Sequence, residues 1–430
     1  MAKYDLKTVA VIGLGYVGLP LAVRAKEKGY EVIGFDIDEE KIKLLKKGQN
    51  LFKKDTFLKE NLLKYPFKAT NNASDIAQAD IHIICVPTPV DHLHHPDLGP
   101  VIGASETVAT HCKKGALIVL ESTVNPYVSE EVVRPIFEKH GFVVGKNIFI
   151  SHCPERINPG DPKWDVTNIP RVVGSFDKKG LEMSLQFYRS IIDAEIRPMR
   201  SIREAEATKI LENSFRNINI AFVNEIAMSF DALGIDVKDV IDGAATKPFA
   251  FMKHYPSCGV GGHCIPVDPH YLVERAKESG FNHGFLKYAM ETNEGMPAYT
   301  VERLQDALNE KRIAMKDTVV GVLGLSYKAN IDDLRESPSF KIIEHLKEHK
   351  CKVETFDPHV KRQSTMKSLE AILKKSQALI LATDHKEFKD ALTPALLKKY
   401  DIKAIIDGKN CLDKELFSKE KSFIYRGIGR

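Results

Sequence analysis

The chain has 430 residues, of which 43% are hydrophobic and 28% are charged, and its formal net charge is +4. No long Lys/Arg block and no apolar run of 18 residues is present, which argues against nucleic-acid binding and against a membrane-spanning segment. Seven scattered cysteines without a CxxC pair indicate reduced thiols, and the first residues run directly into a strand pattern rather than a signal peptide, so we expect a cytoplasmic protein of two or three domains.

Residues 1–200 alternate between apolar strand patterns and helix patterns. TVAVIGLG predicts a buried strand that enters a glycine turn, and YVGLPLAVRAKEKG predicts a helix that ends at Gly29. Further strands are predicted for YEVIGFDID, IHIICVPTP, GALIVLESTV and NIFIS. Strands that alternate with helices indicate a parallel doubly wound sheet, which we assign to the first domain.

The turn after the first strand carries a dinucleotide-binding pattern. Gly13, Gly15 and Gly18 form GxGxxG, in which glycines let the backbone approach a pyrophosphate at the helix N-terminus. Asp36 lies at the end of the second strand, 18 residues after Gly18, where a carboxylate accepts from ribose hydroxyls and repels a 2′-phosphate. The pattern predicts NAD as the cofactor, in preference to NADP.

Residues 201–315 form the second predicted domain. SIREAEATKILENSFRNINIAFVNEIAMSFDALG has a helical period and no proline or internal glycine before Gly234, which predicts a helix roughly 50 Å long. We expect this helix to connect domains and to form a dimer interface. Lys209, Asn213 and Arg216 lie at i, i+4 and i+7 on it. They form either a solvated stripe or, since the helix is otherwise rich in apolar residues, a partnered set in which a buried lysine steadies an alkoxide.

Residues 316–430 form the third predicted domain. DTVVGVLGLSYK, VETFDP, ALILATD and AIIDG predict a second sheet of the nucleotide-binding type. Its first turn offers only GxxG, with Asp357 as the carboxylate at the end of the next strand. A turn without a cofactor and a site for a different nucleotide both remain open. The predicted fold class is α/β, with two Rossmann-like doubly wound parallel-sheet domains joined by a long central helix.

The stretch GVGGHCIPVD, residues 259–268, places Cys264 among glycines and shortly before Asp268. An intracellular cysteine is most often a small buried hydrophobe. Downstream of an NAD turn, however, the pattern also fits a thiolate that attacks an aldehyde, because oxidation of the resulting thiohemiacetal gives a thioester. Such chemistry converts an alcohol to an acid with two NAD molecules. Glu155, between Pro154 and Pro159 in HCPERINPG, is a candidate base, with a surface or ion-paired role as the alternative.

Three clustered histidines, His92, His94 and His95, invite a metal site. A solvated loop before Pro96 is the favoured interpretation, and we expect no metal.

Taken together, the motifs resemble the UDP-glucose/GDP-mannose dehydrogenase family of nucleotide-sugar 6-dehydrogenases. The matching pieces run the whole length of the chain in order: VIGLGYVGLPLA, VPTP, ESTV, PERINPGD, KILENSFRNINIAFVNE, GVGGHCIPVDP and GLSYKANIDDLRESP. The resemblance implies an NAD-dependent enzyme with two Rossmann-like domains, a long helix that dimerises, and a second sheet that binds the UDP half of the substrate.

The resemblance also implies roles for individual residues. Cys264 would be the nucleophile, Lys209 its acid/base and oxyanion partner, and Glu155 the base in thioester hydrolysis. The catalytic set would be completed by Asp268, Thr123 and Asn213. The cofactor would contact Gly13, Gly15, Tyr16, Val17, Gly18, Asp36, Thr88, Thr123 and Arg335. The nucleotide sugar would contact Glu155, Arg156, Ile157, Lys209, Asn213, Arg216, Tyr255, Gly261, Tyr327 and Lys328.

The segment KPFAFMKHYPSCGVGGHCIPVDP is most similar to UDP-N-acetylglucosamine members. Members acting on UDP-N-acetylmannosamine tend to carry His and Arg in the part occupied here by Pro248 and Ala250. The expected substrate is therefore UDP-GlcNAc, followed by UDP-ManNAc or UDP-GalNAc and then UDP-glucose.

The chain departs from the family pattern at several positions. ESTVNPYVS puts Pro126, Tyr127 and Val128 in a turn that often reads STVPPGT. Cys258 either forms an inhibitory disulfide with Cys264 under oxidation or, as we favour, is a passive small residue.

Two other functions also fit parts of the pattern. A two-electron hydroxyacid-type dehydrogenase needs no thiol, and a nucleotide-sugar sensor binds without turnover. The number of NADH molecules formed per sugar separates the three functions, since it would be two, one or none.

Overall fold

A computed structural model describes residues 3–52, 55–91, 96–157 and 163–430. The chain divides into two compact units. The first unit comprises Met1–Glu212 and His270–Phe281, and the second comprises Asn213–Pro269 and Asn282–Arg430. In the part of the chain that the structure describes, no helix is both long and apolar enough to cross a membrane.

The first unit is built on an eight-stranded sheet with the order β3-β2-β1-β4-β5-β6-β7-β8. Its strands are β1 Thr8–Ile12, β2 Glu31–Phe35, β3 Lys68–Thr70, β4 Ile81–Ile84, β5 Leu117–Leu120, β6 Phe149–His152, β7 Arg171–Ser175 and β8 Ile196–Pro198. All neighbouring strands run parallel except β6 and β7, which are antiparallel. The strand order reverses between β1 and β4, which is the place where doubly wound sheets bind ligands beyond the carboxyl ends of their strands.

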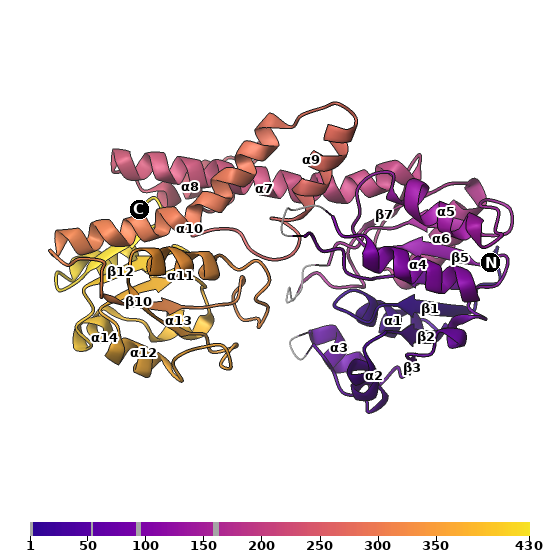
Figure 1. Ribbon diagram of the computed structural model, residues 1–430, viewed down its shortest axis with the longest axis horizontal. Coiled ribbons are helices and arrows are strands. Elements are labelled where there is room, and N and C mark those ends of the chain that lie inside the picture. Colours follow the sequence, from indigo (N-terminus) through magenta and orange to yellow (C-terminus); the bar gives the residue numbers. More distant parts are fainter. Residues whose placement is uncertain (1–2, 53–54, 92–95, 158–162) are drawn as a thin grey trace. The chain divides into compact units, whose positions relative to one another are not determined.

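Helices cover both faces of this sheet (Figure 1). They are α1 Gly18–Glu27, α2 Glu39–Lys46, α3 Thr56–Asn61, α4 Gly99–His111, α5 Arg134–Lys139 and α6 Lys178–Ile191, with short turns η1 Ala73–Ile76 and η2 Ser129–Val133. Alternate residues of β1 point to opposite faces, so Val9 and Val11 pack with α1 and α6, whereas Ala10 and Ile12 pack with α4 and α5.

Helix α7, Ile202–Leu233, is a single continuous helix (Figure 1). It confirms the predicted long helix and ends just before Gly234, whose φ of +69° suits the left-handed residue that follows many helices. Three further helices follow it, α8 Val237–Ala244, α9 Asp268–Glu278 and α10 Gly284–Glu310.

The second unit contains a five-stranded, wholly parallel sheet with the order β10-β9-β11-β12-β13. The strands are β9 Val319–Leu323, β10 Lys352–Phe356, β11 Ala378–Leu381, β12 Ala404–Asp407 and β13 Ile424–Gly427. The remaining helices are α11 Pro338–Glu348, α12 Leu369–Lys375, α13 Lys386–Ala391, α14 Pro394–Lys399 and α15 Lys414–Lys419. Helices α10 and α11 pack on one face of this sheet and α12 to α15 on the other. The predicted fold class, two doubly wound sheets with a long central helix, is confirmed.

Candidate active site

The turn between β1 and α1 has the close packing that a dinucleotide-binding turn requires. Gly13 has φ +94°, and a Cβ there would lie 2.5 Å from the Cys85 carbonyl oxygen at the end of β4. A Cβ on Gly18 would lie 2.0 Å from the Gly13 carbonyl oxygen, whereas Gly15 faces open space. Only glycines fit at Gly13 and Gly18, so the backbone at the switch point is bare where a pyrophosphate binds in such folds.

Asp36 is 6% exposed and is tied to the same turn. Its Oδ2 accepts from the Leu14 backbone N–H at 2.8 Å and from Lys41 Nζ at 2.6 Å. Next to the turn, Val17 is half-buried, and the Tyr16 ring, 38% exposed, lies 4.0 Å from the Phe52 ring. These residues fit an NAD site, in which Asp36 would hold the ribose.

Thr88 and Thr123 follow β4 and β5, the strands next to that turn, and both are half-buried. The Thr88 carbonyl accepts a hydrogen bond from the Tyr271 hydroxyl on α9. The loops after β4 and β5 are tied together, since Ser122 Oγ donates to the Val86 carbonyl at 2.8 Å and accepts from its N–H at 3.0 Å.

Tyr127 stands in the turn where the chain departs from the family pattern. Its φ is +81°, a conformation that a bulky side chain rarely adopts. Arg203 and Arg275 lie 4.4 and 4.5 Å from the centre of its ring. The carboxylate of Glu206 on α7 accepts from the backbone N–H groups of Tyr127 and Ser129, each at 2.8 Å. The turn keeps a left-handed residue because these contacts hold it there.

Glu155, Arg156 and Ile157 follow β6. Glu155 is 8% exposed, and one of its oxygens accepts from the Ile157 N–H. Arg156 is half-buried, donates to the Pro170 carbonyl at 3.0 Å and pairs with Glu212 on α7. Glu155 is therefore a buried carboxylate rather than a surface one, and it has an ion-pair neighbour, Arg171 Nη2, at 3.9 Å.

The three predicted polar residues of helix α7 differ in how deeply they are buried. Asn213 is 4% exposed, Lys209 is half-buried and Arg216 is exposed. The buried polar line of the helix continues through Asn217, whose Nδ2 donates to the Ile265 carbonyl at 3.0 Å. The interpretation as a wholly solvated stripe is wrong for Asn213, which has a buried partner.

The Cys264 loop packs on the carboxyl edge of the second sheet. A Cβ on Gly261 would lie 2.6 Å from Tyr327 Cβ, and one on Gly262, which has φ +88°, would lie 2.8 Å from the Tyr327 ring. The Gly262 N–H donates to the Arg335 carbonyl at 3.0 Å. Because Tyr327 follows β9, the glycines allow the loop to lie directly on that turn, with the half-buried Cys264 thiol two residues further along.

An ion pair lies beside this loop within the second unit. Arg335 pairs with Asp333 through two nitrogens, at distances between 2.5 and 3.1 Å. The hydrogen bond to Asp333 raises the pKa of Arg335, although burial opposes this rise. Arg335 lies beside this loop, since its carbonyl oxygen accepts the hydrogen bond from the Gly262 N–H.

Behind Cys264, the chain enters helix α9. The Asp268 N–H donates to the Cys264 carbonyl at 2.8 Å. The Asp268 side chain, 3% exposed, accepts from Asn213 Nδ2 at 2.5 Å. The structure thus brings together three residues of the predicted catalytic set, Cys264, Asp268 and Asn213.

Other predicted substrate residues lie near the same loop in sequence or on the same sheet edge. Tyr255 is 38% exposed and its hydroxyl donates to Asp242. Lys328 is half-buried beside Tyr327 in the turn after β9.

Cys258 lies in the same loop but in a different environment from Cys264. It is fully buried, and its thiol donates to the Ala382 carbonyl at 3.5 Å. Burial raises the pKa of the Cys258 thiol, which disfavours the reactive thiolate. These features support the favoured interpretation of Cys258 as a passive small residue.

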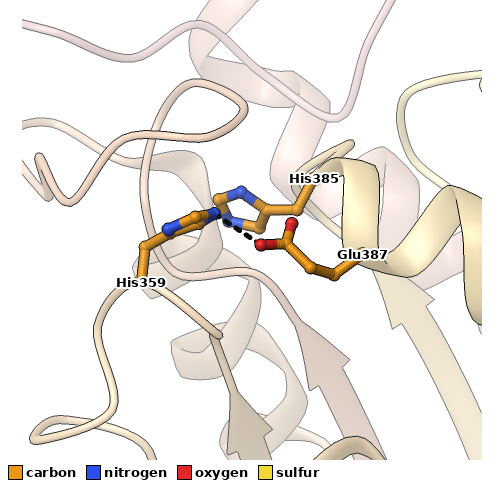
Figure 2. A group of neighbouring side chains, drawn as sticks. All are labelled: His359, His385 and Glu387. Carbon is orange, nitrogen blue, oxygen red and sulfur yellow. Dashed lines mark ion pairs between the residues drawn. The ribbon is translucent and has the colours of Figure 1, made fainter. Parts of the chain in front are cut away.

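A cluster of potential metal ligands, His359, His385 and Glu387, lies at the edge of the second sheet (Figure 2). His385 is fully buried, its Nδ1 accepts from the Asn330 N–H at 2.8 Å, and its Nε2 lies 3.0 Å from Asp357 Oδ2. Both ring nitrogens of His385 are therefore engaged in hydrogen bonds within the protein and are not oriented toward an ion. The predicted histidine cluster, His92, His94 and His95, lies outside the described residues.

Asp357 organises the turn after β9 instead of facing outward. Its carboxylate accepts from the N–H groups of Leu325 at 2.7 Å and Ser326 at 3.0 Å, as well as from His385. Burial opposes its charge, but these bonds lower the pKa of Asp357.

Sequence reasoning missed two groups of polar residues. Glu121 and Arg171, which are 1% exposed each, form a buried ion pair at 3.1 Å in the first unit. Tyr271 and Arg275 attach α9 to the loops after β4 and β5. A signal for the first pair was available, since charged residues end the apolar strand LIVLE and open the strand RVVGS.

A glycine turn at the switch point of a doubly wound sheet is typical of nucleotide-dependent oxidoreductases. The chain belongs to the UDP-glucose/GDP-mannose dehydrogenase family: residues 7–192 match its NAD binding domain, 203–295 its central domain and 321–414 its UDP binding domain. It is therefore an NAD-dependent nucleotide-sugar dehydrogenase. The GxxG turn lies in the segment that matches the UDP binding domain, which favours its interpretation as a site for a different nucleotide over a turn without a ligand.

Relatives match over nearly the whole chain. A UDP-N-acetyl-D-mannosamine dehydrogenase from Pyrococcus horikoshii is 36% identical over 425 residues, covering 98% of this chain and 99% of the relative. A UDP-N-acetyl-D-glucosamine 6-dehydrogenase from Pseudomonas aeruginosa is 37% identical over 418 residues, covering 94% and 98%. A solved structure of the UDP-D-ManNAc dehydrogenase from Pyrococcus horikoshii superposes with a TM-score of 0.91 at 36% identity, covering 98% and 99%.

Proposed function

We propose that this chain oxidises the C6 hydroxyl of a UDP-N-acetylhexosamine to the uronic acid in two NAD-dependent steps, with Cys264 as the covalent nucleophile. The observation that carries the proposal is the Cys264 loop, which packs through Gly261 and Gly262 on the carboxyl edge of the UDP binding domain. The half-buried position of the thiol supports a reactive role for this cysteine.

In the proposed reaction, Lys209 takes the proton of the C6 hydroxyl in the first oxidation. The Cys264 sulfur then bonds to the aldehyde carbon, and Lys209 stabilises the oxyanion of the thiohemiacetal. NAD, when bound, supplies the two-electron acceptor for each of the two oxidations. After the second oxidation a water attacks the thioester, Glu155 takes its proton, and the C–S bond breaks with its electron pair returning to Cys264. Asp268, positioned by Asn213 at 2.5 Å, and Thr123 assist proton and water placement.

The remaining predicted residues bind the two nucleotides. Gly13, Gly18 and Asp36 would hold NAD, since a side chain at either glycine clashes with backbone and Asp36 is fixed to the turn. Tyr327 and Lys328, which follow β9, would contact the nucleotide sugar.

UDP-GlcNAc is the first candidate substrate. The segment that contains Pro248 and Ala250 resembles UDP-N-acetylglucosamine members, and the UDP-N-acetyl-D-glucosamine 6-dehydrogenase from Pseudomonas aeruginosa is 37% identical over 94% of this chain. UDP-ManNAc is the second, and it is supported by the Pyrococcus horikoshii relative at 36% identity over 98% of this chain. Initial rates with UDP-GlcNAc, UDP-ManNAc, UDP-GalNAc and UDP-glucose, followed by NADH absorbance, decide between them.

We also propose a homodimer that forms through α7. Leu211, Phe215 and Phe222, spaced for one face of that helix, are 66%, 46% and 56% exposed. Large apolar side chains that gather on one helix face favour burial against a second copy. Light scattering of the wild type and of Phe222→Glu tests this, and equal masses for the two would contradict it. The seven thiols support the expected cytoplasmic location.

The stoichiometry of the reaction tests the mechanism. We expect two NADH per sugar and an acid product for the wild type, and no acid for Cys264→Ala. Cys258→Ala is the matched control, because it removes a fully buried thiol from the same loop and should keep the ratio of two. Acid formation by Cys264→Ala at the wild-type rate would overturn the proposal.

A further inference from the structure

The antiparallel strand β7 brings an arginine to the edge of the first sheet where β4, β5 and β6 end. Glu121 directly follows β5, and Glu155 comes three residues after the end of β6. The register of β6 and β7 pairs Ser151 with Ser175 and His152 with Gly174. Continuing this register by three residues places Arg171 opposite Glu155, which a parallel strand at this position would not do.

Arg171 lies between two carboxylates in a buried setting. It is 1% exposed, and its Nη1 is 3.1 Å from Glu121 Oε2 while its Nη2 is 3.9 Å from Glu155 Oε1. Both carboxylates have further donors: Glu121 accepts from the Tyr188 hydroxyl at 2.5 Å and from the Cys85 thiol at 3.9 Å, and Glu155 accepts from the Ile157 N–H. The Arg171 guanidinium is therefore the cationic neighbour of both carboxylates.

The other titratable groups around Arg171 are neutral. Burial raises the pKa of Cys153 to about 12 and raises the pKa values of Cys85 and Tyr188 as well. Burial opposes the charge of Arg171, but the Glu121 carboxylate raises its pKa, so Arg171 remains a cation. Burial also raises the pKa of Glu121, and Arg171 and the Tyr188 hydroxyl counteract this rise.

We propose that Arg171 is a positioning residue whose positive charge holds Glu155 in place for thioester hydrolysis, and that Glu121 tunes this effect by pairing with the same guanidinium. The inference rests on the proposed function, because it concerns the step in which Glu155 acts as base. In that step a water proton passes to Glu155, the water oxygen bonds to the thioester carbon, and the C–S electron pair leaves with Cys264. Only an ionised Glu155 can accept the proton.

Two substitutions should shift the pH dependence of hydrolysis in opposite directions. Arg171→Gln removes the cation and leaves two buried carboxylates together, so the acidic limb of steady-state turnover should move up by about one to three pH units. Glu121→Gln removes the competing anion and leaves Arg171 to Glu155, so the same limb should move down. Tyr188→Phe is the matched control, since it removes a hydrogen bond to Glu121 without changing charge, and should move the limb less than either.

A pre-steady-state experiment separates this role from a merely structural one. With hydrolysis impaired, Arg171→Gln should still release two NADH per active site in a burst and then turn over roughly tenfold or more slowly near neutral pH. Arg171→Lys, which restores a cation, should recover part of the steady-state rate, and it carries the test together with Glu121→Gln if Arg171→Gln does not fold.

The inference would be overturned if Arg171→Gln and Glu121→Gln moved the acidic limb in the same direction, with Arg171→Lys taking the place of Arg171→Gln if the latter does not fold. It would also be overturned if the NADH burst were lost together with the steady-state rate. Failure of the proposed function itself looks different, because the wild type would then not form two NADH per sugar.

Discussion

Replacing Gly261 with alanine tests whether the Cys264 loop depends on close packing against the turn after β9. The added Cβ would lie 2.6 Å from Tyr327 Cβ and 2.7 Å from the Glu336 carbonyl oxygen. An ordinary contact at this position begins near 3.4 Å, so the loop or its neighbours must move by about 0.8 Å. Neither contact is the tip of a flexible side chain, and the backbone must therefore take up most of the movement.

We expect Gly261→Ala to destabilise the protein by about 1–3 kcal/mol and to lower kcat by roughly 100-fold, because overpacking strains the fold and a misplacement near 1 Å disrupts the reacting geometry. Thermal unfolding measures the first effect, and NADH formation at saturating substrate measures the second. The alkylation rate of Cys264 by iodoacetamide, followed by mass spectrometry, reports the thiol's surroundings directly.

Gly295→Ala is the matched control. Gly295 lies in α10, and its added Cβ would meet nothing within 4 Å, so this variant should keep wild-type activity and gain up to about 1 kcal/mol of stability. Wild-type kcat and melting temperature for Gly261→Ala would refute the reasoning, since the loop would then not be held against Tyr327.

Tyr127 has φ +81°, so Tyr127→Gly should be more stable than Tyr127→Ala by about 1 kcal/mol in thermal melts, and the reverse order would show that the turn is not left-handed in solution. Burial raises the pKa of Glu206 from 4.5 to about 7, so between these pH values the folded protein keeps a proton that the unfolded chain releases. The resulting stabilisation, up to about 3 kcal/mol, is complete below pH 4.5 and is lost as the pH rises to about 7. Melting temperatures between pH 5 and pH 8 should accordingly fall more for the wild type than for Glu206→Gln, and parallel profiles would contradict the assignment. Asn213→Ala removes the donor at 2.5 Å from the buried Asp268 carboxylate and should lower stability by about 1–3 kcal/mol in thermal melts, and an unchanged melting temperature would contradict this role.

Features that depend on residues close together in the sequence could be predicted, whereas contacts between distant segments could not. The glycine turn, the strand ends and the long helix were predictable because backbone freedom, apolar periodicity and the absence of helix breakers act within a few residues. Helix α7, Ile202–Leu233, matches the expected segment almost to its ends.

Contacts between distant segments were not predictable in the same way. The three polar residues on α7 looked alike in sequence, but Asn213 is buried against Asp268 while Arg216 is exposed, because only the fold decides which side of a helix meets the rest of the protein. Tyr127 departs from the family's turn pattern, and the side chains that contact its ring, Arg203 and Arg275, lie far along the chain.

Residue types at short spacing are enough to predict two nucleotide-type sheets, an NAD turn and a cysteine in a glycine-rich loop. The antiparallel pairing of β7 with β6, which places Arg171 between Glu121 and Glu155, could be seen only in the fold. Strand direction and register come from the packing of the whole sheet, and no local pattern in RVVGS encodes which carboxylates its first residue will meet.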